Sequence, residues 1–265
     1  MTTEKGVPIR AITRGLAVLQ AINRGGSITM MEIARTSRVP YPTACRIVQT
    51  LLHEGMIERE PARKRYRATA LVQSLASGFH DDSQLVAIAG PHINTLCEKL
   101  LWPISITSRV GAHMMVRDST HTKTSLTLNN YYPGFTLPIM ECSSGKAYMA
   151  FCGDEERDYL LEGLQTIDGA AERMAMLLLS NDSLLRDVRR NGYATQSRNA
   201  YTANPGKTSS IAVPLFRGDS VAGAIVVIFF AVAMTMEQAI EQFLAPLKGT
   251  ADAISAELGS IAKAA

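Results

Sequence analysis

The most constraining feature of this sequence is the stretch 28–69, where two helical patterns are followed by two strand patterns. Within residues 41–54 the apolar side chains recur at the spacing of one helix face, on a stripe formed by Ala44, Ile47, Val48, Leu51 and Leu52. Ser27 and Thr29 offer capping side chains before a shorter helix around residues 31–34. Pro40 pushes the preceding residue out of helical geometry, which separates the two helices by a tight break. The stretch therefore predicts a helix-turn-helix.

The polar face of the second helix indicates what the motif contacts. It carries side chains that can reach phosphates and base edges near the helix N-terminus, namely Tyr41, Thr43, Arg46 and Gln49. Residues 56–59 and 65–69 are predicted to be strands, and the turn that joins them carries Arg63, Lys64 and Arg65. A basic wing of this kind contacts phosphate or the minor groove, while the helix reads bases in the major groove. A polar face is also typical of any surface helix, but the adjoining wing favours double-stranded DNA as the partner.

The distribution of charge supports a polyanion as partner of the N-terminal part only. Residues 1–70 contain 12 Lys and Arg against 5 Asp and Glu, a net charge of +7, whereas the other 195 residues contain 15 against 19, a net charge of −4. A membrane surface is also anionic, but the sequence has no long basic amphipathic helix. Its longest apolar run, 221–234, is shorter than the ~20 residues that span a bilayer. The pattern predicts DNA and not a membrane.

The rest of the chain mixes helical and strand patterns. Helices are predicted over 13–25, 70–80, 83–101, 143–151, 154–164, 180–191 and 235–261, and strands over 104–110, 113–117, 124–130, 209–216 and 220–230. The first of these helices is predicted to carry Leu16, Leu19 and Ile22 on its apolar face. This mixture predicts an α+β fold, with helices flanking a sheet in the larger part. The predicted domains are a winged helix-turn-helix at 1–69, a connector helix at 70–82 and a sensor domain at 83–265.

Composition adds several expectations. With 46% hydrophobic and 19% charged residues, the chain is expected to be an ordinary soluble protein of about two domains. Residues 1–14 lack the apolar core of a signal peptide, and the four cysteines show no paired spacing, so we expect reduced thiols in the cytoplasm. No cofactor is predicted. His113 and His121 lie in a strand and in a turn beyond it, with Asp118 between them, and this spacing does not predict a metal site.

Several motifs, taken together in this order, resemble the IclR-type family of bacterial transcription regulators. They are Thr13 to Leu19, Thr43 to Ile47, Gln49 to Leu51, Ser144 to Ala147, Asn191 to Tyr193 and Ser210 to Pro214. The resemblance covers the chain from about Arg10 to the last helix. It implies a winged helix-turn-helix, a GAF-like effector-binding domain, and a homodimer or homotetramer on a palindromic operator. Residues 115–121 and 233–235 are similar to the branch of the family that controls aromatic-acid catabolism.

The resemblance also implies an effector pocket. Its residues in this sequence are Leu137, Ser143, Ser144, Ser197, Arg198, Ser209, Ser210, Val226 and Ile228. Family members that bind small oxo-acids carry hydroxyls at the last two of these positions. In this sequence both positions are apolar. Burial of apolar ligand surface against them contributes about 25 cal/mol per Å², which favours a larger, partly aromatic acid. A helix N-terminus near Ser143 suits a carboxylate, and Arg109 or Arg198 is a candidate cation.

Two other functions fit parts of the sequence. Ser143 and Lys146 match the S-x-x-K pattern of a serine nucleophile with its lysine, which would make the chain a hydrolase with an attached DNA-binding module. The accompanying S-D-N and K-T-G motifs are missing from the sequence. A nucleic-acid-binding scaffold whose C-terminal domain only oligomerises is the other alternative. A ligand-responsive regulator, and not an enzyme, is the interpretation that accounts for most of the chain.

Overall fold

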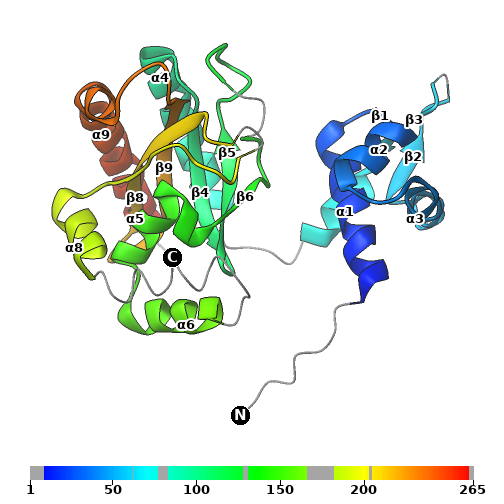
Figure 1. Cartoon of the computed structure of the whole chain (residues 1–265), viewed down its shortest axis with the longest axis horizontal. Coiled ribbons are helices and arrows are strands. Elements are labelled where there is room, and N and C mark those ends of the chain that lie inside the picture. Colours follow the sequence, from blue (N-terminus) through cyan, green and yellow to red (C-terminus); the bar gives the residue numbers. More distant parts are fainter. Residues whose placement is uncertain are drawn as a thin grey trace. The chain divides into compact units, whose positions relative to one another are not determined.

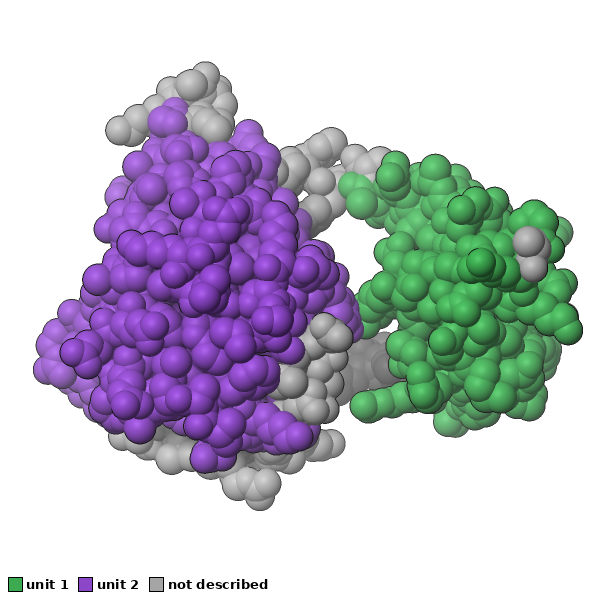
Figure 2. All heavy atoms as spheres, turned by 90° about the horizontal axis from the view of Figure 1, so that it is seen from above, with its two compact units in different colours: residues 1–80 green, residues 81–265 purple. Residues whose placement is uncertain are grey.

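The computed structural model describes residues 9–61, 63–76, 83–127, 131–165, 182–202 and 205–262. The chain divides into two compact units, residues 1–80 and 81–265, which are described separately (Figure 2). None of the helices in the described ranges is both long and apolar enough to cross a bilayer.

The first unit is a winged helix-turn-helix, as predicted. Its elements are α1 (Arg10–Gly25), β1 (Ile28–Thr29), α2 (Met30–Ser37), α3 (Tyr41–His53), β2 (Ile57–Arg59), β3 (Arg65–Ala68) and the 3-10 helix η1 (Ala70–Ala76) (Figure 1). The three strands form an antiparallel sheet in the order β1-β3-β2. The three helices bury a common core that includes Val18, Ile22, Ile33, Ala44 and Val48.

Local chemistry sets the boundaries of α2. The side chain of Thr29 accepts a hydrogen bond from the Glu32 backbone N–H, while the Glu32 carboxylate accepts one from the Thr29 N–H, so the two residues form a capping box. At the other end Arg38 takes the left-handed conformation, with φ 55°, and its N–H bonds back to the last turn. This sharp turn, followed by Pro40, redirects the chain into α3.

Two details of the first unit differ from the sequence interpretation. Helix α1 begins at Arg10 and buries Val18 and Ile22, while Leu16, predicted to lie on its apolar face, is 54% exposed. The connector contains the 3-10 helix η1 over residues 70–76 in place of a longer α-helix, and Leu71 and Leu75 are exposed there. The remaining predicted connector residues, 77–82, lie outside the described ranges.

The second unit is an antiparallel sheet with helices on both faces. Its elements are α4 (Ser83–Leu100), β4 (Ile104–Val110), β5 (His113–Ser119), β6 (Thr136–Pro138), the 3-10 helix η2 (Ile139–Glu141), α5 (Ser143–Phe151), α6 (Asp154–Gln165), α8 (Asp182–Asn191), β7 (Ala194–Gln196), β8 (Thr208–Arg217), β9 (Ser220–Phe230) and α9 (Met236–Ala262). The strand order is β6-β5-β4-β9-β8-β7. The α+β fold predicted from the sequence is confirmed.

The alternation of side chains along β9 explains why the second unit has a hydrophobic core on each face of its sheet. Val227 and Phe229 belong to the core that α4 and α9 cover, whereas Val226 and Ile228 belong to the core on the opposite face. Helices α4 and α9 lie on one side of the sheet and α5 lies on the other (Figure 1). Because both faces are buried, β9 is a continuous apolar run and shows no polar alternation. A cavity of this unit lies on the α5 face.

The prediction of a strand over residues 124–130 is wrong for the residues in this range that the structure describes. Residues 124–127 form bends and coil, and residues 128–130 lie outside the described ranges. The strand that pairs with β5 is instead β6, three residues long. Because β6 has only three residues, the alternation of apolar and polar side chains that marks a strand could not be recognised in its sequence. The equally short edge strand β7 was not predicted either.

Candidate DNA-reading surface and effector cavity

The outward face of α3 presents the residues that were predicted to read DNA. Tyr41, Arg46 and Gln49 are exposed and Thr43 is partly exposed, because Ala44 on the other side of the helix is buried in the core. Within the described ranges, the side chains of Arg46 and Gln49 form no hydrogen bond or ion pair. Both are therefore free to contact a ligand outside the protein.

The wing residues fall into two kinds. Arg63 and Lys64 are exposed in the turn between β2 and β3. Arg65 instead points back to the helices: its Nη2 donates to the Ser27 carbonyl oxygen at 2.7 Å, and it forms an ion pair with Glu32 at 3.5 Å. Its guanidinium therefore fastens the wing to the start of α2, and only Arg63 and Lys64 extend freely from the turn.

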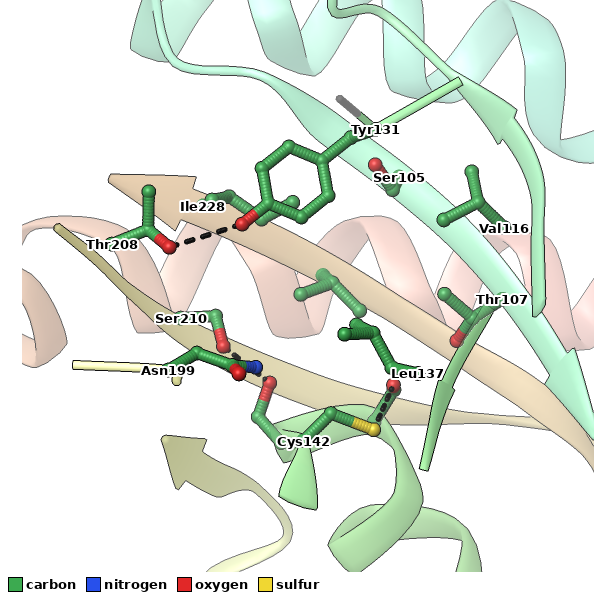
Figure 3. Close-up of a pocket in the computed structure, with 13 residues that line it drawn as sticks. Ser105, Thr107, Val116, Tyr131, Leu137, Cys142, Asn199, Thr208, Ser210 and Ile228 are labelled. Atoms are coloured by element: carbon green, nitrogen blue, oxygen red, sulfur yellow. Dashed lines mark hydrogen bonds between the residues drawn. The ribbon is translucent and has the colours of Figure 1, made fainter. Parts of the chain in front are cut away.

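A small cavity lies between the sheet and the start of α5, with a volume of about 20 Å³. Its lining residues are Ser105, Thr107, Val116, Tyr131, Leu137, Cys142, Ser143, Ser144, Asn199, Thr208, Ser210, Val226 and Ile228 (Figure 3). Six of the nine residues predicted for the effector pocket are among them: Leu137, Ser143, Ser144, Ser210, Val226 and Ile228. The apolar wall of the cavity lies on β5, β6 and β9, with Ser105 and Thr107 of β4 between them, and its polar wall lies at α5 and β8.

The polar wall is held by hydrogen bonds between side chains. Ser143 Oγ lies 2.8 Å from Ser210 Oγ, which joins α5 to β8. Tyr131 Oη lies 3.0 Å from Thr208 Oγ1, and burial raises the pKa of this tyrosine, which therefore stays protonated at neutral pH. Figure 3 shows both bonds bordering the cavity. The hydroxyls of these two pairs thus satisfy each other.

The structure does not place Ser197, Arg198 and Ser209 in this cavity. Successive residues of a strand point to opposite faces, so Ser209 and Ser210 cannot both face α5. Ser209 accepts a hydrogen bond from the Arg198 backbone N–H. Ser197 and Arg198 are exposed, and these three residues line a separate surface depression together with residues 231–236 and 238.

Seven lining residues were not predicted. They are Ser105, Thr107, Val116, Tyr131, Cys142, Asn199 and Thr208. Alternation was the available signal for some of them, since Ser105 and Thr107 occupy alternate positions of β4, and Thr208 lies two residues before Ser210. Asn199, which is 5% exposed, follows directly after the predicted Arg198. No sequence pattern identifies Tyr131, because it lies in a segment without periodicity.

Cys142, and neither of the two serines, caps the start of α5. Its Sγ accepts a hydrogen bond from the Gly145 N–H at 3.4 Å, and Ser143 and Ser144 are the first two residues of the helix. Burial raises the pKa of the Cys142 thiol. Gly145 is required because a Cβ there would lie 1.7 Å from the Ile139 carbonyl oxygen. This close approach brings the helix N-terminus directly onto the cavity.

The cation expected beside the ligand does not line the cavity, and none of its 13 lining residues is charged. Arg109 Nε lies 2.9 Å from Glu156 Oε1 and 3.3 Å from Tyr148 Oη, so its charge is already compensated. Burial, together with the hydrogen bond to Glu156, raises the pKa of Tyr148 to about 12. Arg198 lies in the surface depression.

The geometry does not assemble the serine–lysine pair of a hydrolase. Lys146 Nζ donates to Gln196 Oε1 at 2.7 Å and to the Thr195 carbonyl oxygen at 3.3 Å, while Ser143 bonds to Ser210. A serine nucleophile requires a base within hydrogen-bond reach. Among the described residues, moreover, no group of three or more His, Cys, Asp or Glu side chains is placed to hold a metal ion.

Comparison with known proteins identifies relatives along the whole chain. A protein of Haemophilus influenzae described as an uncharacterized HTH-type transcriptional regulator is 22% identical over 264 residues, 98% of this chain and 96% of that protein. The DNA-binding transcriptional repressor YiaJ of Escherichia coli is 25% identical over 263 residues, 98% of this chain and 92% of the repressor.

A solved structure shares the fold. It is an IclR homolog from Microbacterium hydrocarbonoxydans complexed with 4-hydroxybenzoate, with a TM-score of 0.64 and 21% identity, and the similarity covers 94% of this chain and 99% of that one. This sequence matches the models of two protein-family domains. They are the IclR helix-turn-helix domain, over residues 11–61, and the bacterial transcriptional regulator IclR C-terminal domain, over residues 79–256. Together they span both units, and this chain therefore belongs to the IclR family of bacterial transcriptional regulators.

Proposed function

We propose that this regulator controls an aromatic-acid catabolic operon in the cytoplasm and that its effector is a monocyclic aromatic carboxylate bound in the cavity at α5. The observation that carries the proposal is the mixed lining. Val116, Leu137, Val226 and Ile228 offer apolar surface to a ring, and Ser143, Ser144 and Ser210 offer hydroxyls to a carboxylate. A ligand with an apolar body and one anionic end fits this division.

The start of α5 suits the carboxylate. The first N–H groups of a helix have no partner within the helix, and its dipole favours negative charge at that end. Here that end is buried against the cavity, with Ser143 and Ser144 only 1% and 2% exposed. A carboxylate bound there would replace hydrogen bonds that the protein now makes within itself.

The size of the cavity couples binding to a change of shape. A volume of about 20 Å³ accommodates roughly one water molecule, whereas a protein cavity that binds benzene measures about 150 Å³. An aromatic acid must therefore part α5 from β8 and break the Ser143–Ser210 bond. Because the ligand would bind only the opened arrangement, it would shift the population toward it, as an effector must.

The complex of a fold neighbour with 4-hydroxybenzoate supports the choice of ligand class, although the two chains share only 21% identity. On the DNA side, we propose that Tyr41, Thr43, Arg46 and Gln49 on α3 meet base edges and that Arg63 and Lys64 contact phosphate. Arg65 would support this contact by positioning the wing.

We further propose that the protein binds a palindromic operator as a homodimer or homotetramer, because recognition of a two-fold site requires a two-fold protein. Light scattering on the full chain tests the assembly. A monomer at micromolar concentration, with and without operator DNA, would exclude it.

Calorimetric titration of the full chain tests the effector. We expect saturable binding of benzoate and 4-hydroxybenzoate and none of pyruvate. The bound acid should also change the affinity for operator DNA, since an effector acts through its different affinities for two states. Binding of pyruvate without binding of either aromatic acid would refute the proposed ligand class.

A further inference from the structure

The proposed ligand is an anion, yet the cavity wall carries no charge. Three of the described cationic residues belong to segments that also contribute to its lining. Arg109 is paired with Glu156 at 2.9 Å, and Arg198 is exposed in the surface depression. The third is Lys146, on the first turns of α5, the helix whose N-terminus lies on the cavity.

Two neighbouring hydrogen bonds link α5 to the edge of the sheet. Ser143 bonds to Ser210 on β8, and Lys146 bonds to Gln196 on β7. Ser143 and Lys146 are three residues apart, so they lie on the same side of the helix. Gln196 and Ser210 are direct partners in the β7–β8 ladder. Direct partners in antiparallel strands have Cα atoms about 5 Å apart and side chains on the same face. The lysine therefore lies one strand away from the cavity's polar wall.

Among the described residues, Lys146 forms no direct ion pair. Both of its hydrogen-bond acceptors, the Gln196 amide oxygen and the Thr195 carbonyl oxygen, are neutral. Among the described residues no carboxylate lies within 4.0 Å of its amine, although Glu141 and Cys142 act on it from farther away. Burial is the main effect on this amine and lowers its pKa. A partly buried ammonium of this kind gains from a nearby anion.

We propose that Lys146 is the cation that makes the cavity select an acid over its uncharged analogue. When the ligand parts α5 from β8, the ammonium exchanges Gln196 for the carboxylate bound at Ser143 and Ser210. Its neutral partners hold it beside the cavity until then, whereas the carboxylate partner of Arg109 would compete with the ligand. This inference rests on the proposed function and adds the residue that recognises the charge.

The test compares an acid with its isosteric amide. Benzoate and benzamide are titrated into the full-length wild type, Lys146→Gln and Lys146→Arg. We expect Lys146→Gln to weaken benzoate about tenfold or more, the scale of one charge-assisted hydrogen bond, and benzamide less than about twofold. Lys146→Arg should restore most of the benzoate affinity. Lys99→Gln, an equal change of charge on α4, should alter neither.

A second pair of variants keeps Lys146 in place. Gln196→Glu gives the amine an internal carboxylate, and we expect it to weaken benzoate and to leave benzamide unchanged. Gln196→Met removes the amide acceptor without adding charge, and benzoate should bind at least as well as in the wild type. These variants keep the test valid if Lys146→Gln loosens the edge of the sheet.

The outcomes separate this inference from the proposed function. Unchanged benzoate affinity in Lys146→Gln, or equal loss of both ligands, overturns the role of Lys146 while the aromatic effector stands. If pyruvate binds in place of benzoate and its binding depends on Lys146, the aromatic class is wrong and the role of Lys146 holds. Failure of the wild type to bind any of these acids overturns both.

Discussion

The hydroxyl oxygens of Ser143 and Ser210 lie 2.8 Å apart on the polar wall of the cavity. Ser143 is the first residue of α5, and Ser210 lies on β8, so this one bond fastens the helix to the sheet. Both side chains are buried, and each satisfies the other. The bond therefore stabilises the contact between α5 and β8, and the proposed ligand would have to compensate for its loss.

A double-mutant cycle measures this bond. Ser143→Ala or Ser210→Ala alone should lower the free energy of unfolding by about 1–3 kcal/mol, since each leaves a buried hydroxyl without a partner. The double variant should be less destabilised than the sum, with a coupling of about 0.5–1.5 kcal/mol. Trp102 is the single tryptophan and packs against Phe229 in the second unit, so its fluorescence in urea reports this unit. Additive effects would show that the bond contributes nothing.

Arg46 should carry sequence information. Its side chain extends freely from the exposed face of α3, and a bidentate contact to a base is worth about 1–3 kcal/mol. We expect Arg46→Ala to weaken operator binding by that amount and binding to unrelated DNA much less, as measured by fluorescence anisotropy. Equal losses on the two DNAs would assign Arg46 to phosphate.

The two kinds of wing residue should respond differently. Replacing Arg63 and Lys64 by Ala should flatten the dependence of log K on log salt, by about 0.9 for each phosphate that the wing no longer neutralises. Arg65→Ala should mainly lower the melting temperature of the first unit, because Arg65 holds Ser27 and Glu32. An unchanged salt slope in the Arg63/Lys64 variant would remove the wing tip from the DNA interface.

The capping box of α2 should make the first unit sensitive to acid. Hydrogen bonds from Thr29 lower the pKa of Glu32 below its ordinary value of 4.5. The stability that this carboxylate contributes is therefore present above pH 4.5 and is lost as the pH falls through the lower, folded-state pKa. Circular dichroism melts at falling pH should show this loss in the wild type and not in Glu32→Gln. Glu54→Gln, a substitution at an exposed position directly after α3, should follow the wild type.

The sequence predicted the first unit well because its signals are local. Thr29, Pro40 and the apolar stripe of α3 act within a few residues of where they lie, so spacing alone locates the helices. The position of Leu16 was misjudged for the opposite reason. The apolar residues of α1 permit more than one stripe, and packing against α2 and α3 selects Val18 and Ile22.

The cavity could be predicted only in part because it is assembled from distant segments. Val226, Ile228 and Ser210 lie on long strands whose period is readable. Asn199 and Tyr131 come from irregular segments, and only the tertiary fold brings them to the same place as β8. The absence of a charged group from the lining could not be foreseen, because the partners of Arg109 depend on contacts between α5, α6 and β4.

Ile228 gives the sharpest test of the aromatic ligand. Its side chain is 5% exposed and lies on the apolar wall, where the ring is expected to pack. Replacing it by Ser removes apolar burial worth about 25 cal/mol per Å², so Ile228→Ser should weaken 4-hydroxybenzoate by about 1–2 kcal/mol, or roughly 5- to 30-fold. Calorimetric titration of the full chain measures the change.

Val232→Ser is the matched control, because Val232 is 85% exposed in the turn that follows β9 and lies outside the cavity. It should bind 4-hydroxybenzoate as the wild type does. The fluorescence of Trp102 verifies that Ile228→Ser remains folded at the temperature of the titration. If the folded Ile228→Ser variant keeps full affinity for 4-hydroxybenzoate, the ring does not pack on β9, and the aromatic acid binds elsewhere or not as proposed.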